Sequence, residues 1–158
     1  MRHTSFKHMD CPIARSLERV GEWWSILILR DALHGLTRFD EFQKSLGIAP
    51  NMLTRRLNAL VESGLLERRR YSEHPERFEY VLTEKGRDLQ PVMLALLAWG
   101  DRYTAEQGPP LETVHGDHAF HMVPVCSECG EPVDTHNIHN RPGPGADEEQ
   151  RRRAWPAR

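Results

Sequence analysis

The feature of this sequence that most constrains its fold is the stretch Leu46–Tyr71, which predicts a turn, a helix, a glycine stop and a basic strand. The apolar residues of the helix recur at helical spacing and would share one face: Leu53, Leu57, Leu60 and Val61. Asn51 and Arg55 would lie on the opposite face, and Gly64 would end the helix. We therefore expect a protein body on one side of this helix and amide and guanidinium groups on the other.

A second short helix is expected just before this one. Thr37-Arg38-Phe39-Asp40 resembles a capping box with Asp as its acid, and the helix that it opens would end at Gly47. The turn Ile48-Ala49-Pro50 then leads into the next helix, which predicts a helix-turn-helix. Ala49 cannot cap that helix, so its start should be about 1 kcal/mol weaker than a serine-capped start. Pro50 at the first helical position offsets part of this loss.

The flanking segments complete a winged helix-turn-helix. Glu22–His34 is apolar nearly all round, as expected of a central, buried helix, and an earlier helix would begin at Pro12. Leu65–Tyr71 and Phe78–Leu82 are two strand candidates, joined by a loop with Pro75 at its bend. The expected fold class is therefore mainly α with a small β-wing (α+β).

A long C-terminal helix is expected from Glu84 to about Tyr103, capped by Thr83 and kinked at Pro91. Its apolar residues are too many for a small winged domain to cover: Leu89, Val92, Met93, Leu96, Leu97, Trp99 and Tyr103. We expect this dimerisation helix to be buried against a second copy, together with the face formed by Ile13, Leu17 and Val20. A two-fold homodimer would place two recognition helices about 34–36 Å apart.

The distribution of charge points to a nucleic-acid partner more clearly than the total charge does. The 158-residue chain carries a formal net charge of −2. Between Lys44 and Ser72, however, six basic residues stand against two acidic ones, a local excess of four positive charges. Such a concentration on one segment is the electrostatic footprint of DNA binding.

Candidate DNA contacts lie on both helices of the predicted motif and on the wing. They are Thr37, Arg38, Asn51, Met52, Thr54, Arg55, Arg56, Arg70 and Arg77. The residues from Asn51 to Arg55 would reach base edges, where Arg and Asn can each form two hydrogen bonds. Arg56 and the start of the preceding helix would hold phosphate, and Arg77 would contact the DNA backbone or the minor groove. The alternative is a solvated helix and edge strand with ordinary surface arginines.

The ordered motifs of the chain resemble those of the HxlR-type winged-helix transcriptional regulators. They are Cys11-Pro12, Glu22-Trp23-Trp24, Arg38-Phe39, Leu53-Thr54-Arg55-Arg56-Leu57, Leu60, Gly64-Leu65, Pro75, Glu79-Tyr80, Leu82-Thr83, Gly86 and Leu89–Pro91. The resemblance covers about residues 10–103, and Ala49 departs from the serine usual in the family. It implies a homodimer that binds double-stranded DNA at a pseudo-palindromic operator of a bacterial promoter. In a subset of the family, the cysteine before the first helix senses oxidants or electrophiles.

Cys11 is accordingly the candidate redox-sensing residue. It precedes Pro12 at a helix N-terminus, where the helix dipole favours a thiolate, and Lys7 and His8 are close in sequence. The alternative is a small residue packed at the dimer seam and untouched by oxidants.

From Gly108 onward the composition changes. Cys126-Ser-Glu-Cys129-Gly130 has the spacing of half a zinc ribbon, and a second such pair is lacking. His118 and His121, or the neighbouring histidines, could supply the remaining ligands of a structural zinc. The competing interpretations of the two cysteines are a redox-active dithiol and an unligated turn.

The expected organisation is a flexible N-terminus (1–9), the winged helix-turn-helix and dimerisation domain (10–106), a Cys/His-containing extension (107–140) and a disordered tail (141–158). The odd number of cysteines does not suggest a disulfide framework, which predicts a cytoplasmic location. The sequence shows no apolar leader and no apolar stretch long enough to cross a bilayer, so we expect no membrane contact. We expect a non-enzymatic, homodimeric repressor. The alternatives from other classes are a thiol redox protein and a metal-sensing regulator, both using Cys126 and Cys129.

Overall fold

The computed structural model describes residues 11–109, 111–134 and 136–152, which fall into two compact units. The first unit is Met1–Leu97 and the second is Ala98–Arg158, so their boundary lies within a helix rather than at residue 106. The predicted flexible segment 1–9 lies outside the described residues. No helix among the described residues is both long enough and apolar enough to span a membrane.

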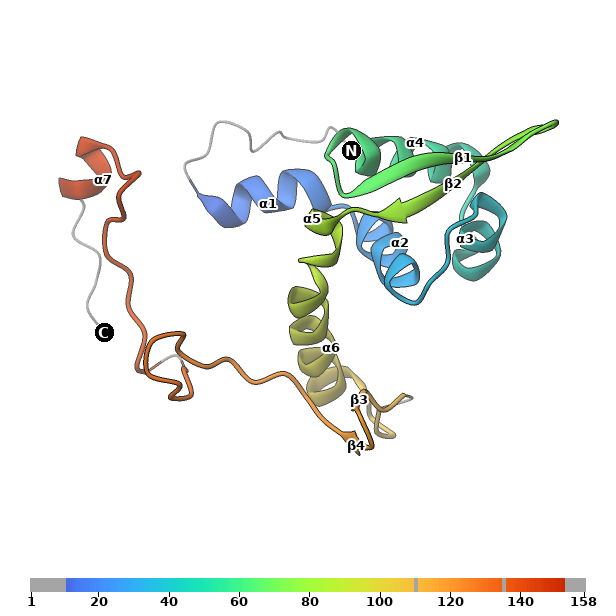
Figure 1. The fold of residues 1–158 in the computed structure, drawn as a ribbon. Coiled ribbons are helices and arrows are strands. Elements are labelled where there is room, and N and C mark those ends of the chain that lie inside the picture. Colours follow the sequence, from blue (N-terminus) through green and yellow to red (C-terminus); the bar gives the residue numbers. More distant parts are fainter. Residues whose placement is uncertain (1–10, 110, 135, 153–158) are drawn as a thin grey trace. The chain divides into compact units, whose positions relative to one another are not determined.

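The first unit is a winged helix-turn-helix, which confirms the predicted α+β fold (Figure 1). Its elements are α1 (Pro12–Val20), α2 (Trp23–Leu33), α3 (Phe39–Leu46), α4 (Pro50–Glu62), β1 (Leu66–Glu73), β2 (Glu76–Leu82), α5 (Glu84–Arg87) and the first half of α6 (Gln90–Thr104). The antiparallel pair β1–β2 is the wing, and it projects from the helices as a thin ribbon.

The core of the first unit lies where α2, α3, α4 and the base of the wing meet. Its fully buried side chains are Ile28, Leu29, Phe42, Leu53, Leu57, Leu60 and Leu66. The predicted central position of α2 is thus confirmed for its middle turns. Trp23, in the first turn of α2, is instead 77% exposed.

The start of α3 differs from the predicted capping box. The Glu41 carboxylate accepts the backbone N–H groups of Arg38 (2.9 Å) and Thr37 (3.0 Å). Arg38 is the N-cap, so the third helical position is Glu41, and the assignment of Asp40 as the box acid was wrong by one residue. These two N–H groups, Arg38 first, hold the pKa of Glu41 below its usual value.

The start of α4 is partly capped by a residue inside the helix. Ala49 provides no side-chain cap, as predicted, and Pro50 removes one unpaired N–H group. Asn51 Oδ1 accepts the N–H of Met52 at 2.8 Å. This contact supplies one hydrogen bond that a capping serine would otherwise make.

Replacing Ala49 with serine is expected to raise the free energy of unfolding by about 0.5 kcal/mol, the lower end of the usual range for N-caps. The gain should be small because Asn51 already satisfies Met52, although the N–H of Asn51 itself could still be capped. Urea unfolding monitored by circular dichroism would measure it. Ala59→Ser, on an exposed position of the same helix, should give no gain, and an equal gain there would refute the capping explanation.

The wing is longer than predicted. Ser72 pairs with Arg77 and Glu73 with Glu76, so the predicted loop 72–77 shrinks to the two residues between the strands. The ladder is irregular between Arg70 and Ser72. At the base of the wing, the Tyr80 N–H donates to the Thr37 carbonyl at 2.7 Å, which joins the wing to the start of α3.

The predicted long C-terminal helix is divided in two. Thr83 caps α5 as expected, its Oγ1 accepting the Gly86 N–H at 3.1 Å. The chain then leaves the helix, and Pro91 lies in the first turn of a separate helix, α6, where its missing N–H costs nothing. Val20 and Leu89, which we expected to be buried against a second copy, pack instead against the core of the first unit.

The second unit contains short elements after the C-terminal half of α6. They are β3 (Val114–His115), β4 (His118–Ala119) and α7 (Glu148–Arg152). Helix α7 lies inside the segment 141–158 that we expected to be disordered. Its Arg152 and Glu148 side chains, one turn apart, are 2.6 Å from each other, which stabilises this single turn.

Candidate nucleic-acid interface

Helix α4 presents a polar face to solvent because its apolar side chains are held in the core. Leu53, Leu57 and Leu60 are fully buried. The side chains on the other face are exposed, as the helical spacing predicted: Asn51, Thr54, Arg55 and Asn58. Met52 is half-buried at the edge of that face. The recognition helix therefore combines a rigid apolar anchor with an accessible polar surface.

Within that surface, Arg55 is the charged group most available to a base. Its Nη2 donates to Met52 Sδ at 3.1 Å, and no carboxylate partner is found for it among the described residues. Thr54 Oγ1 donates to the Pro50 carbonyl at 2.9 Å. A thioether is a weak acceptor, so Arg55 would lose little by leaving Met52 for a guanine edge. The exchange would also leave no carboxylate unpaired.

Arg56, predicted to hold phosphate, is already engaged in an ion pair within the protein. Its Nη2 is 2.8 Å from Glu22 Oε2, and only 17% of its side chain is exposed. Its Nε is buried with no hydrogen-bond partner. Arg56 thus ties α4 to the start of α2, and the predicted phosphate contact would have to compete with Glu22.

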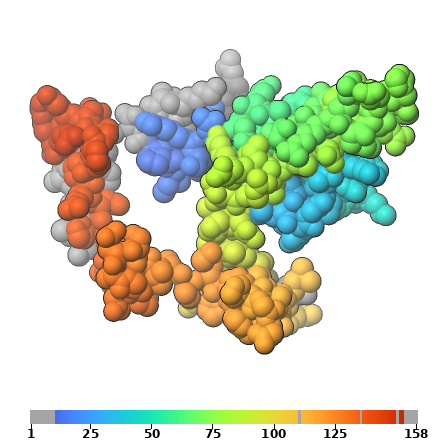
Figure 2. All heavy atoms as spheres, viewed as in Figure 1, coloured from blue at the N-terminus to red at the C-terminus, as the bar shows by residue number. Residues whose placement is uncertain are grey.

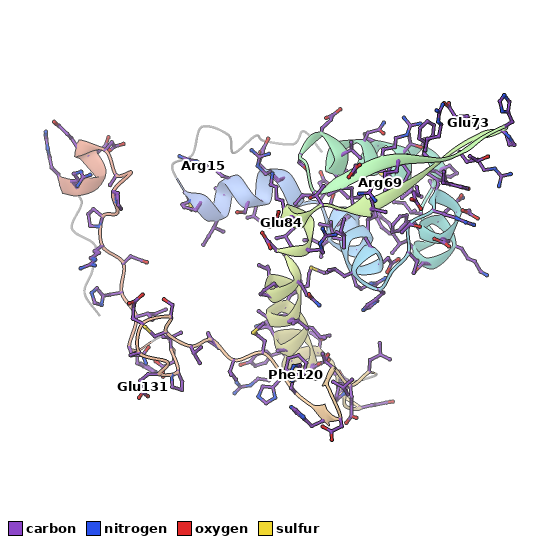
Figure 3. All side chains as sticks on the ribbon, in the orientation of Figure 1. Arg15, Arg69, Glu73, Glu84, Phe120 and Glu131 are labelled. Atoms are coloured by element: carbon purple, nitrogen blue, oxygen red, sulfur yellow. The ribbon has the colours of Figure 1, made fainter. Side chains whose placement is uncertain are left out.

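The arginines of the wing are not equivalent. Figure 3 labels Arg69 along the wing and Glu73 near its tip. Arg69 is paired with Glu67 at 3.0 Å, and Arg70 lies 3.4 Å from Glu73 and 3.7 Å from Glu76. The hydrogen bond to Glu67 raises the pKa of Arg69.

Two wing arginines lack such a carboxylate in the described part of the chain. Arg68 stacks 3.6 Å above the Phe78 ring, and Arg77 is exposed near the tip. Figure 2 shows the tip projecting into solvent. Arg77 is therefore the predicted wing contact that the structure leaves most accessible. Arg70 remains exposed, but the two acids beside it reduce its attraction for phosphate.

Of the two predicted DNA contacts at the start of α3, one is exposed and the other is already hydrogen-bonded within the protein. Arg38 is exposed, with its guanidinium 4.9 Å from the centre of the Tyr71 ring, so it points toward the wing. Thr37 is half-buried, its N–H bound by Glu41 and its carbonyl by Tyr80. Sequence spacing did not indicate the role of Tyr71, because the partners are brought together only by the wing.

Cys11 is half-buried at the N-cap of α1, and its side chain makes no capping hydrogen bond. The free thiol therefore lies at the start of α1, the helix whose exposed residues include Ile13 and Leu17.

The structure brings two of the four predicted zinc ligands together. Cys126 and Cys129 adjoin each other, and the backbone N–H groups of Cys129 and Glu128, with the Cys129 side chain, lower the pKa of Cys126. His118 lies 3.4 Å from Asp117. Among the described residues, no three or more His, Cys, Asp or Glu side chains are grouped so that they could hold a metal, so neither His118 nor His121 joins the cysteines.

Comparison with known proteins gives consistent matches to one family. The family model for the HxlR-like helix-turn-helix matches residues 19–108. An uncharacterized HTH-type transcriptional regulator of Mycobacterium tuberculosis, Rv3095, is 45% identical over 137 residues, covering 84% of this chain and 86% of its own. The structure of PA1374 from Pseudomonas aeruginosa, a candidate transcription factor, is 55% identical with a TM-score of 0.66, covering 89% of this chain and 98% of its own.

A further solved structure is that of the redox regulator HypR in its oxidized form. It is 34% identical with a TM-score of 0.54 and covers 58% of this chain and 96% of its own. The family model ends at residue 108. The matches to Rv3095 and PA1374 cover 84% and 89% of this chain, which is more than residues 1–108 make up, so both extend beyond residue 108. Those two relatives therefore share at least part of the C-terminal extension.

Proposed function

Because the chain belongs to the HxlR-like helix-turn-helix family and is a DNA-binding transcriptional regulator, we propose that it acts as a homodimeric repressor in the cytoplasm. Two copies bind a pseudo-palindromic operator and block the adjacent promoter. The observation that supports this proposal is a set of apolar side chains left exposed on α1 and α6.

These side chains form the candidate dimer surface. They are Ile13 and Leu17 on α1, and Val92, Leu96 and Leu97 on the part of α6 that belongs to the first unit. None of the residues of α6, all of which the structure describes, is buried. Exposed apolar surfaces of this kind mark interaction sites. In a two-fold dimer the same surface serves both partners and is removed from water on both.

The dimer gives the polar face of α4 its function. One recognition helix reads only a short half-site, and two related by a two-fold axis would enter successive major grooves about 34–36 Å apart. Asn51 and Arg55 would contact base edges, while Arg38 and Arg77 would contact the phosphate backbone. Repression follows if the operator overlaps the promoter.

Selection of bound DNA from a random pool, using the full chain, tests this proposal. We expect an inverted repeat whose half-sites are centred about 10 base pairs apart, bound by a dimer, with affinity that falls steeply with salt. Sedimentation should show the same dimer without DNA, and a reporter carrying the selected site should be less transcribed when the protein is present. A single half-site bound by a monomer would refute the dimer, and increased transcription would refute repression.

We propose that Cys11 controls this binding. Oxidation by a diazene such as diamide joins the Cys11 thiols of the two copies in a disulfide, and the diazene takes up the two electrons and two protons that the thiols lose. A cross-link at the N-cap of α1 alters the helix that carries Ile13 and Leu17, and so alters the dimer. HypR, whose structure covers 58% of this chain, is a redox regulator.

Diamide should therefore weaken operator binding by the wild-type chain about 5–150-fold, the usual range of coupling between two sites. Cys11→Ser should bind the operator normally and be insensitive to diamide in the same gel-shift assay. The Cys126→Ser/Cys129→Ser variant serves as the control and should keep the response. A full response in Cys11→Ser would disprove the sensor role.

A further inference from the structure

The segment Val125–Pro132 folds into a small closed loop around two cysteines. Val125 and Pro132 form an antiparallel bridge, and the Cys126 N–H donates to the Glu131 carbonyl at 2.8 Å. The Gly130 N–H donates to the Cys126 carbonyl at 2.9 Å, and Gly130 has a φ of +73°, a conformation that suits glycine. Figure 3 labels Glu131, which lies on this loop. The loop therefore turns back on itself immediately after Cys129.

This loop has no apolar core to stabilise it. Val123 and Val125 are exposed, as is Cys129, and the cysteines are free thiols rather than a disulfide. A structural element this small gains little from hydrophobic burial and usually needs a disulfide or a metal ion as a cross-link. Cys126 and Cys129 are the two side chains of this loop that could supply such a cross-link.

The placement of the two cysteines suits metal ligands. The hydrogen bonds from the Cys126 N–H to the Glu131 carbonyl and from the Gly130 N–H to the Cys126 carbonyl hold both cysteines on one turn. Two residues separate the cysteines, which is the ligand spacing of zinc knuckles.

We propose that Cys126 and Cys129 form a two-thiolate clamp for a thiophilic metal ion of the zinc class. Sulfur ligands select such ions over Mg²⁺ and Ca²⁺, which prefer oxygen. This site lies outside the segment that the family model covers, and it does not depend on DNA binding or on Cys11. Its expected role is to cross-link the loop and so to stabilise the extension.

Zinc usually takes four ligands, so the clamp supplies half of the set. In the described residues no third His, Cys, Asp or Glu is grouped with the two cysteines. The other positions are filled by the same two cysteines of a second copy, by histidines that move to the metal, or by water. The metal content per chain distinguishes the first arrangement, one ion for two chains, from the others.

Cobalt substitution tests the clamp directly. The full chain is reduced, stripped of metal and titrated with Co²⁺, whose bonds to thiolate give a charge-transfer absorption band. We expect the band in the wild-type chain and its loss on adding Zn²⁺, which binds such sites more tightly than Co²⁺. Cys126→Ser/Cys129→Ser should lack the band and bind zinc more than about 100-fold more weakly, beyond the effect of altering a ligand's surroundings.

Cys11→Ser is the matched control and should retain the full band, because Cys11 belongs to the other unit. Circular dichroism of each variant would verify that the winged helix-turn-helix is intact. Absence of the band in the reduced wild-type chain, or an unchanged band in Cys126→Ser/Cys129→Ser, would overturn the proposal. Recovery of a Cys126–Cys129 disulfide, with no metal bound after reduction, would overturn it in favour of a redox dithiol.

Discussion

Replacing Leu57 with alanine is expected to lower the free energy of unfolding by about 2–5 kcal/mol. Leu57 is fully buried and lies on α4 between Leu53 and Leu60, which are also fully buried. The loss combines the transfer of the side chain from the core with the cavity that remains. Because small domains unfold at a cost of roughly 5–15 kcal/mol in total, this substitution removes a large share of the stability.

Urea unfolding monitored by circular dichroism would measure the change. Asn58→Ala is the control, because Asn58 is the next residue on the same helix and is exposed. Its effect should stay within about 0.5 kcal/mol, as for other surface substitutions. Similar losses in both variants would contradict burial as the source of the effect, because alanine has the highest helix propensity and neither loss could come from propensity.

Replacing Arg55 with alanine is expected to weaken operator binding by about 1–3 kcal/mol, or roughly 5–150-fold. Arg55 is exposed on the polar face of α4 and has no carboxylate partner in the described part of the chain. It can therefore place two guanidinium nitrogens against a base edge at little electrostatic cost. Discrimination among bases should relax at the position that Arg55 contacts.

Arg69→Ala is the matched control for this measurement. Arg69 is also an exposed arginine of the first unit, but Glu67 already neutralises it at 3.0 Å. Its loss should change affinity little, since exposed ion pairs contribute weakly. Titration of labelled operator at fixed salt would compare the two variants, and an equal effect at both positions would show that binding reports total charge rather than base contact.

The different effects expected at Arg55 and Arg69 change the view of which arginines provide affinity for DNA. The arginine run from Arg68 to Arg70 looks like a uniform basic strand. In the structure, Arg69 and Arg70 are paired with acids on the wing itself, and Arg68 covers Phe78. In the proposed complex, Arg77 and the residues of α4 would therefore provide more of the DNA contact, and the proposed dimerisation would provide the second half-site.

Several elements were predictable because their cause is local. The helical spacing of Leu53, Leu57 and Leu60 identified the buried face of α4, and burial confirms it. Thr83 was recognised as a cap because its side chain bonds a backbone group three residues away. The acid of the α3 capping box was misplaced by one residue, since the N-cap position is decided by where Thr37 and Arg38 meet the wing.

The pairing of Arg56 with Glu22 could not be predicted in this way. The two residues are 34 positions apart, and only the packing of α4 against α2 brings the guanidinium to the carboxylate. Similarly, the stacking of Arg38 near Tyr71 needs the wing to fold back beside α3. Neither contact leaves a periodic signal along the chain.

The sequence by itself determined the order of the elements from α1 to β2, the winged helix-turn-helix fold and the residues on the polar face of α4, because periodicity, caps and glycine stops act within a few residues. Only the tertiary structure decided which arginines are free to meet DNA and which are neutralised. That outcome depends on distances between side chains from different elements, and these distances are set when the apolar faces of α2, α3, α4 and the wing pack together.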